Sequence, residues 1–488
     1  MPAIITNKFR IHNSEQFHES FSEASPNVYY LGIGRPQPFA TTTRPDARNE
    51  NEGTDTAPIT PVDDVVEEFY AYDDMLAAKK IAASDTSFVV PRRNWTTGTV
   101  YDYYRHDYGR RITGTTTQQT STSSQSTLFD STFYVLTSAR NVYKCLDNNA
   151  GATSTVEPTG TSTNILSTGD GYKWKFMYTL SAAQQSNFLS VDFMAVATNA
   201  TVSSAAVDGA INIVKIKAVG TGGTDGTHTS IPIRGDGSGG TVSVTIASGI
   251  VSAVTVTAAG TGYTYGYIRL ADINSAGGGS LVSAELDCII EPKGGHGFNA
   301  DKELGGFFVM VNVNLEGAEA GSSGDFTTSN DFRKIMLIRD PQASGSAATA
   351  TTLRGVKVVR FAASPTPGTF TIDEKISQSS TGAIGKVIEW DSANRLLYYI
   401  QTRFTDEGVD SNGNATAFSG ANVITGATSS ATGTPSTASE TVDSVVLTSG
   451  YAAAEIDADT GDVIYLEQRV PITRASDQTE NIKLIIEF

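Results

Sequence analysis

The sequence predicts a mainly β protein with some helix, in which a discontinuous α+β core domain carries inserted antiparallel β-sandwich or barrel modules. Composition is the first observation: the 488 residues include 46 Gly and abundant Thr, Ser and Ala, as expected for short strands joined by tight turns. Periodicity is the second, because several runs alternate apolar and polar residues as half-buried strands do. Arrangement is the third, since the alternating runs fall in two internal stretches separated by more hydrophobic, strand-like runs.

The beginning of the chain predicts both helix and strand. Residues 3–11 are expected to form a strand. Asn13 is expected to cap a short helix that places Phe17 and Phe21 on one face. Residues 27–34 predict a second strand, which Arg35-Pro36 would end.

The clearest helical pattern begins at Thr60-Pro61, where Thr60 can cap the helix and Pro61 suits its first position. Apolar residues recur at helical spacing as far as Leu76, and Lys79 and Lys80 would complement the helix dipole at its end. Adjacent carboxylates of one helix do not face each other as the paired acids of a glycosidase must. We therefore expect a solvated helix face for Asp63-Asp64, Glu67-Glu68 and Asp73-Asp74.

Beyond a polar, low-complexity loop at 114–127, strands dominate the expectation. Runs of β-forming residues bounded by Gly, Pro, Asn or Ser recur to the end of the chain. The expected strands cover residues 132–136, 141–146, 172–180, 211–218, 241–246, 250–257, 307–313, 332–338, 368–376, 385–390, 396–404, 463–466 and 481–488.

These runs divide the chain into a core and two insertions. A single core domain is expected from residues 1–205, 280–352 and 446–488. Residues 206–279 and 353–445 are each expected to form an inserted β module. A core tolerates such insertions where the two ends of the inserted module lie close together.

Charge and cysteine content restrict the partners and the compartment. With 35 basic and 52 acidic side chains the net charge is −17, which excludes a generally basic nucleic-acid-binding surface. Residues 1–10 lack the apolar core of a secretory signal, and no stretch approaches the 18 apolar residues of a membrane helix. Cys145 and Cys288 have no CxxC partner, which favours a reducing compartment over a disulfide scaffold or a cysteine zinc site.

A search for catalytic motifs finds no candidate. There is no G-x-S-x-G, no Walker A motif and no H-x-x-x-H zinc pair. The acids Asp457, Asp459 and Asp462 are better explained as an acidic turn than as a calcium loop. His296, which lies between glycines, is the most site-like histidine, although a histidine in a tight loop is more often structural. We therefore predict no enzyme activity, no catalytic or metal-binding residues and no cofactor.

Six clusters of residues are more distinctive than generic strands or loops. They are AIITNKFR at 3–10, PRRNW at 91–95, VYKCLD at 142–147, GDGYKW at 169–174, GDVIYLEQRVPI at 461–472 and DQTENI at 477–482. In this order they resemble the baseplate wedge subunit of T-even-type contractile-tailed bacteriophages, the gene product eight family. FRKI at 332–335 followed by Asp340-Pro341 is similar to a further segment of that family. The resemblance covers about residues 1–205, 280–350 and 445–488, whereas 211–267 and 353–441 have no counterpart.

The resemblance implies a structural virion protein that scaffolds neighbouring proteins in a contractile tail. It implies a homodimer that contacts other baseplate wedge subunits, located in the tail baseplate after assembly in the host bacterial cytoplasm. Nucleic acid and membrane are not expected as partners. An acidic chain agrees with this role, because surface acid can pair with basic patches on partners and opposes premature self-aggregation.

Alternatives remain open for several aromatic and basic residues. Residues Tyr263, Tyr265 and Tyr267 could stack on a sugar, which would suit a glycan-binding or glycan-degrading tail protein, or could line a module interface. An extracellular adhesin is disfavoured by the missing export signal. The tryptophans Trp95 and Trp174 are expected to anchor the core. The last expectations concern Arg92 and Arg93, which could pair with carboxylates, and the aromatics of 100–108, which form a candidate dimer contact or a packed edge strand.

Overall fold

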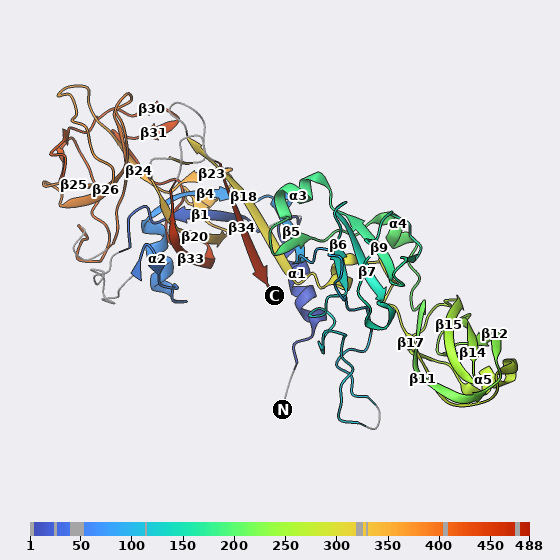
Figure 1. The fold of residues 1–488 in the computed structure, drawn as a ribbon. Helices are drawn as coiled ribbons and strands as arrows, with labels where there is room; N and C mark the ends of the chain where they lie inside the picture. Colours follow the sequence, from blue (N-terminus) through green and yellow to red (C-terminus); the bar gives the residue numbers. More distant parts are fainter. Residues whose placement is uncertain are drawn as a thin grey trace. The chain divides into compact units, whose positions relative to one another are not determined.

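The computed structural model describes residues 4–23, 27–39, 53–112, 115–318, 326–327, 330–403, 408–473 and 479–488. Several residues that the sequence analysis mentions lie outside these ranges, namely Ala3, Gly114, Phe404, Asp477 and Gln478. The chain forms two compact units, each assembled from separate stretches (Figure 1). The first unit contains Met1–His18, Ser87–Met310 and Ile485–Phe488, and the second contains Glu19–Thr86 and Val311–Leu484.

A five-stranded antiparallel sheet forms the centre of the second unit. Its strands are Tyr29–Gly34 (β1), Met75–Lys80 (β4), Phe332–Arg339 (β20), Thr352–Arg354 (β23) and Asp462–Ile472 (β33), in the order β23-β4-β1-β20-β33. Every residue of β1 and all but the last of β20 are buried, which explains the apolar character of β1 and of 335–338 in β20. The core below the sheet includes Tyr30, Met75 and Met336. Segments from both ends and the middle of the chain therefore share one sheet.

The strand β4 corrects the expected long helix. Helix α2 covers only Val65–Asp73, and Asp64 rather than Thr60 caps it, because Asp64 Oδ1 accepts the Glu67 N–H at 2.9 Å. The sequence MLAAKK of β4 favours helix, but β1 and β23 pair with it on its two sides. Tertiary hydrogen bonding thus outweighs the small intrinsic preference of Ala, Leu and Lys for helix.

The module expected at 353–445 forms a seven-stranded antiparallel sheet, in the order β29-β28-β25-β26-β27-β24-β32, and a hairpin of β30 and β31. It extends to β32 at 451–452, beyond the expected boundary. Phe361, Ile376 and Leu397 belong to its core. Its strands are Lys357–Arg360 (β24), Lys375–Gln378 (β25), Ala383–Asp391 (β26), Leu396–Ile400 (β27), Ile424–Gly426 (β28), Thr432–Gly433 (β29), Glu440–Val442 (β30), Val445–Leu447 (β31) and Tyr451–Ala452 (β32).

The strand expected at 368–376 is wrong over most of its length, since β25 begins only at Lys375. Glu374 holds the preceding residues in a turn. Its carboxylate accepts the N–H groups of Thr371, Thr428 and Ser429 at 2.7, 3.0 and 2.9 Å. A buried acid that gathers several backbone donors specifies local geometry that strand periodicity does not reveal.

The first unit carries a four-stranded antiparallel sheet and two strands of a larger, five-stranded sheet. The sheet has the order β6-β7-β9-β8, and β5 pairs with β10. Trp174 is fully buried in β9. The elements are Thr86–Pro91 (β5), Tyr134–Leu136 (β6), Asn141–Asp147 (β7), Leu166–Ser167 (β8), Lys173–Thr179 (β9), Ala182–Phe188 (α3), Phe193–Ala195 (β10), Ala200–Ser204 (α4) and Ala300–Leu304 (α6).

The first expected module lies in the first unit and has two antiparallel sheets, β12-β14-β15 and β11-β17-β16-β13, around one apolar core. Because β17 pairs with β11, this module extends beyond the expected boundary at residue 279. Its elements are Ile213–Gly223 (β11), Gly226–Pro232 (β12), Arg234–Gly235 (β13), Thr241–Ala247 (β14), Ile250–Ala258 (β15), Gly266–Tyr267 (β16), Leu270–Ile273 (α5), Asn274–Gly278 (η3) and Gly279–Ile289 (β17).

The expected N-terminal strand is instead the beginning of helix α1, Asn7–Glu19. Thr6 starts the helix, because its hydroxyl accepts the Phe9 N–H at 3.3 Å, and Asn13 lies within the helix rather than capping it. Ile11 and Ser14 are its buried residues, and their spacing of three is helical. The strand expected at 3–11 is therefore wrong, because residues 7–11 are helical.

The mainly β fold class with an α+β core is confirmed. Two long strands, Phe308–Ala318 (β18) and Thr479–Glu487 (β34), pair with each other and contribute residues to both units. None of the helices within the described ranges has the length and apolarity that a membrane crossing needs. The remaining short elements are Gly53–Thr54 (β2), Ala57–Pro58 (β3), Ala83–Asp85 (η1), Asn149–Gly151 (η2), Phe326–Thr327 (β19), Gln342–Ala343 (β21) and Ser346–Ala347 (β22).

Candidate functional site

Buried charged side chains are the most distinctive polar feature of both units. They form networks that join segments far apart in the sequence. Within the described ranges, no group of three His, Cys, Asp or Glu side chains could hold a metal ion. Cys145 and Cys288 are both buried free thiols. The networks are described first, followed by the residues that the sequence analysis singled out.

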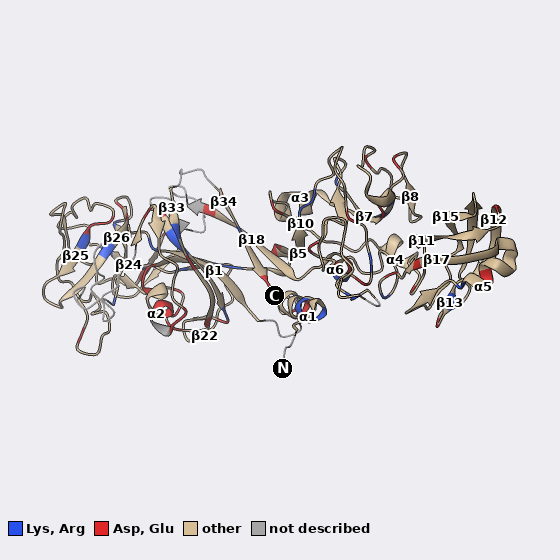
Figure 2. Cartoon of the chain, turned by 60° about the horizontal axis from the view of Figure 1, so that its bottom comes forward, with Lys and Arg blue, Asp and Glu red and all other residues tan. Residues whose placement is uncertain are grey.

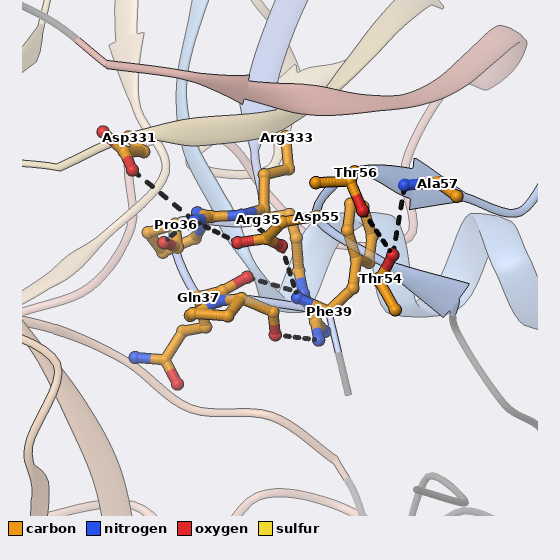
Figure 3. A network of polar contacts seen from close by, with 11 residues as sticks. Arg35, Pro36, Gln37, Phe39, Thr54, Asp55, Thr56, Ala57, Asp331 and Arg333 are labelled. Carbon is orange, nitrogen blue, oxygen red and sulfur yellow. Dashed lines mark hydrogen bonds and ion pairs between the residues drawn. The ribbon is translucent and has the colours of Figure 1, made fainter. Parts of the chain in front are cut away.

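The network around Arg333 fixes the segment that follows β1 onto β20 (Figure 3). Arg333 Nε and Nη2 each donate to a carboxylate oxygen of Asp55 at 3.0 Å, and Nη1 donates to the Pro36 carbonyl at 2.6 Å. Asp55 also accepts the Phe39 N–H at 2.9 Å. The hydrogen bond from Arg333 holds the pKa of Asp55 below its usual range. A two-pronged contact of this kind fixes orientation as well as distance.

Lys334, the next residue of β20, pairs with an acid from the expected solvated helix face. Its Nζ lies 3.2 and 3.1 Å from the two carboxylate oxygens of Asp74, and both side chains are buried. Arg35 Nη1 lies 3.8 Å from the same carboxylate. The expectation of a solvated face is wrong for Asp74 and also for Glu67, which is buried. Because consecutive strand residues point to opposite faces, Arg333 and Lys334 anchor different segments.

Asp73, another acid of that group, pairs with Arg403 beyond the end of β27. Arg403 N and Nε donate to the Asp73 carboxylate at 2.7 and 2.6 Å, so a solvated position is wrong here too. Nη1 and Nη2 donate to Asp459 at 2.7 and 3.1 Å. The guanidinium also lies 3.2 Å from the centroid of the Phe69 ring. Burial raises the pKa of Asp73 to about 6, although Arg403 acts to lower it.

The carboxylates of the acidic turn at 457–462 bind other groups of the protein. Asp457 accepts the Gly345 N–H at 2.7 Å, Asp459 binds Arg403, and Asp462 pairs with Arg339. This arrangement agrees with the interpretation of these acids as a turn. The turn and the module that begins after β23 are thus joined through one arginine.

In the first unit, His296 belongs to a buried polar cluster. The Lys144 and Glu303 side chains, 0% and 3% exposed, form an ion pair beside it. His296 Nδ1 lies 3.8 Å from Glu303, and its ring meets the Tyr104 ring edge-on at 4.7 Å between centroids. The gap that His296 shares with Tyr104 and Glu291 has no room for a water molecule. The geometry therefore favours a structural histidine.

Burial and pairing set the charges of this cluster. Burial lowers the pKa of His296 and that of Lys144. Burial alone would raise the pKa of Glu303, but Lys144 and His296 lower it to about 2. Glu303 also accepts the N–H groups of Gly297 and Asn299 at 2.8 and 3.2 Å. At neutral pH an ionised Glu303 therefore organises the loop around it.

The aromatic segment at 100–108 packs inside its own unit. Tyr101 and Tyr104 are only 4% and 5% exposed, and Tyr103 packs against the cluster that contains Trp174. Arg105 pairs with acids of the same unit. The expected exposure is wrong for Tyr101 and Tyr104, and the segment packs on its own unit without forming a strand. The sequence did not show this because its aromatic side chains do not follow a single period.

The arginines and the tryptophan of PRRNW at 91–95 form hydrogen bonds within their own unit. Arg92 Nη1 and Arg93 Nη2 donate to backbone carbonyls at 2.8 and 3.1 Å instead of to carboxylates. Trp174 is a core anchor as expected, with no exposed surface. Trp95 is half-buried, and its Nε1 donates to Ser154 Oγ at 3.1 Å.

Asp170 of the GDGYKW cluster has a role that the sequence analysis missed. Its carboxylate accepts the N–H groups of Thr155 and Val156 at 2.8 and 3.0 Å and the Thr168 hydroxyl at 2.5 Å. Burial acts to raise its pKa, but these hydrogen bonds lower it to about 2. The glycines on either side were the available signal, since Gly171 has a φ of 83° that favours glycine.

Residues 3–154 match the family Phage-Gp8, described as Bacteriophage T4, Gp8. The match contains the clusters at 3–10, 91–95 and 142–147 and confirms the resemblance to this family. It supports a structural role in the baseplate wedge of a phage virion. No curated protein matches the chain significantly.

Proposed function

We propose that this protein is a homodimeric subunit of a baseplate wedge in a contractile phage tail, where it scaffolds neighbouring wedge proteins. The family match over residues 3–154 is the observation that carries this proposal. We propose further that it has no catalytic activity and is incorporated into the virion during assembly in the bacterial cytoplasm.

The buried networks support a scaffolding role. Arg333 and Lys334 tie two segments to one strand, and Arg403 ties a module to α2. Replacing such contacts during binding would leave charges buried without partners, which is costly. A protein so constructed keeps the shape of each unit while partners dock on its surface.

The test is to purify tails from phage and to identify their proteins by mass spectrometry and immunogold labelling. The protein should be present in the baseplate at a fixed ratio to other wedge proteins. Sedimentation of the isolated chain at micromolar concentration should show a dimer. Absence from purified tails would overturn the proposed role, whereas a monomer in solution would overturn only the dimer.

A glycan-binding function is the second candidate, favoured by two exposed aromatics of the first module. Tyr265 and Tyr267 are 56% and 47% exposed, whereas Tyr263 is buried in the module core. Arg234, which pairs with Tyr267 across two strands, and Arg269 both bind Asp272, so planar polar groups lie beside an aromatic face. Binding to a glycan array that is lost in a Tyr265→Ser, Tyr267→Ser variant would support this alternative.

We also propose that the first module folds separately from the core. Ile213 and Ile289 are paired in the sheet, so the ends of the module lie side by side. Replacing 214–288 by a short Gly/Ser linker, which keeps the core residues Ile213 and Ile289, should leave a cooperative melting transition. Loss of that transition would assign the module to the core, as the contacts of Lys215 with Asp147 and Tyr103 would then be essential.

A further inference from the structure

The largest hollow among those found in the first unit lies beside the start of helix α1. It has a volume of about 1340 Å³ and adjoins a second hollow of about 700 Å³. Both hollows are lined by Asn7, Lys8, Asp208, Pro292 and Lys293, so they form one continuous groove. An elongated groove of this size is suited to a segment of polypeptide.

The acids of this groove are already engaged. Asp208 accepts the Gly294 N–H at 2.6 Å, and Glu15 pairs with Lys302 at 3.2 Å. Glu303 pairs with the buried Lys144, and Glu291 accepts the His296 N–H at 2.9 Å. The walls therefore present little uncompensated negative charge to a ligand.

Two lysines that line the groove, unlike its acids, carry charge that is not engaged. Lys8 and Lys293 are exposed and line both hollows. Neither forms an ion pair or hydrogen bond within the described part of the chain. Figure 2 shows Asp and Glu on elements of both units, in keeping with the net charge of −17, and shows Lys and Arg on α1. The groove thus offers free positive charge on an acidic protein, which complements an acidic ligand.

The groove also has an apolar part. Phe298 lines it and is 51% exposed, and Phe129 and Ile11 lie along its wall. The Phe298 ring lies against Gly294, where an added Cβ would come within 2.3 Å of the ring. The ring is therefore held by the loop that Glu303 organises, and a partner would not need to order it.

We propose that this groove binds an extended segment of another baseplate protein that carries Asp or Glu residues beside an apolar residue. The acids would pair with Lys8 and Lys293, and the apolar side chain would cover Phe298. We assign the groove to a different protein because its free positive charge complements an acidic partner, and crosslinking to a second copy of this chain would contradict that assignment. This inference rests on the proposed baseplate function.

The first test places a photo-crosslinking amino acid at residue 298 in phage-assembled tails, with the same amino acid at residue 191 as control. Val191 is 85% exposed in the same unit and outside the groove. Residue 298 should crosslink to one acidic segment of a different tail protein, and residue 191 should not crosslink to that segment. Crosslinks only to a second copy or to a basic segment, or none at 298, would overturn the groove assignment. Absence of the protein from tails would instead overturn the proposed function, and this inference with it.

The second test uses the crosslinked segment as a synthetic peptide. A Lys8→Glu, Lys293→Glu variant should bind it at least 10-fold more weakly in fluorescence anisotropy, and added salt should weaken wild-type binding. Arg110→Glu is the matched control, since Arg110 is exposed in the same unit but does not line the groove. Equal binding by the double variant and the wild type, with both melting alike, would overturn the proposal.

Discussion

The two units bury an acid beside a cation with opposite effects on the acid. In the first unit, Lys144 and two backbone N–H groups all donate to Glu303, and the pKa of Glu303 falls to about 2. In the second unit, Arg403 divides its donors between Asp73 and Asp459, and the pKa of Asp73 rises to about 6. Asp74 beside it adds repulsion. Burial acts to raise the pKa of both carboxyls, so the donors committed to each carboxylate decide the direction of the shift.

Removing one partner of the fully buried pair should produce the largest effect. Glu303→Leu leaves the Lys144 ammonium buried without its acid, and we expect a loss of about 3–5 kcal/mol in unfolding free energy. Urea denaturation measures this loss. A Lys144→Met, Glu303→Leu double variant should recover most of it, because no charge then remains unpaired. Equal destabilisation in the two variants would show that the charge is not the cause.

Disrupting the Arg333 network should have the second-largest effect on stability, because Asp55 is partly exposed to solvent. Arg333→Leu removes both bonds to Asp55 and the bond to the Pro36 carbonyl, and should cost about 1.5–3 kcal/mol. Asp55→Asn, which keeps one acceptor, should cost less. Denaturation of both variants tests this order, and a loss below about 0.5 kcal/mol for Arg333→Leu would contradict the importance of the network.

The contributions of Asp73 and Glu303 to stability should change in opposite directions with pH. The folded pKa of Asp73, about 6, exceeds the usual value of 3.8, so its contribution to stability is present below the lower value and is lost as pH rises through 6. Glu303 behaves oppositely, and its contribution is lost as pH falls from 4.5 towards 2. Asp73→Asn should therefore remove part of the decline between pH 4 and 7. Parallel stability curves for the wild type and this variant would contradict the raised pKa.

Removing an exposed ion pair should have the smallest effect on the unfolding free energy. Lys217 and Glu285, 55% and 58% exposed, lie 2.8 Å apart on the first module. Lys217→Ala should change the unfolding free energy by less than about 0.5 kcal/mol, since water solvates both charges. Thermal melting at low and high salt checks this. A loss comparable to that of Arg333→Leu would show that exposure is not what separates the pairs.

Local periodicity identified most strands but failed where distant contacts decide. The runs at 141–146, 241–246 and 332–338 became β7, β14 and β20, and the alternation at 241–246 matches the burial of Val242, Val244 and Ile246. Residues 75–80 were expected in a helix, since their composition favours helix and pairing with β1 and β23 makes them a strand. Likewise, Asp73 and Asp74 were expected in solvent, because their partners Arg403 and Lys334 lie more than two hundred residues away.

The sequence by itself determined the fold class, the family resemblance and the lack of a recognisable catalytic motif, because composition, strand periodicity and residue clusters are local properties. Tertiary structure alone decided which charges are buried, that His296 sits beside the Lys144–Glu303 pair, and that Lys8 and Lys293 border one groove. Burial and pairing depend on which distant segments meet. Because the sheets of this chain combine segments from both ends and the middle, no single segment of the sequence shows which charges will be buried or paired.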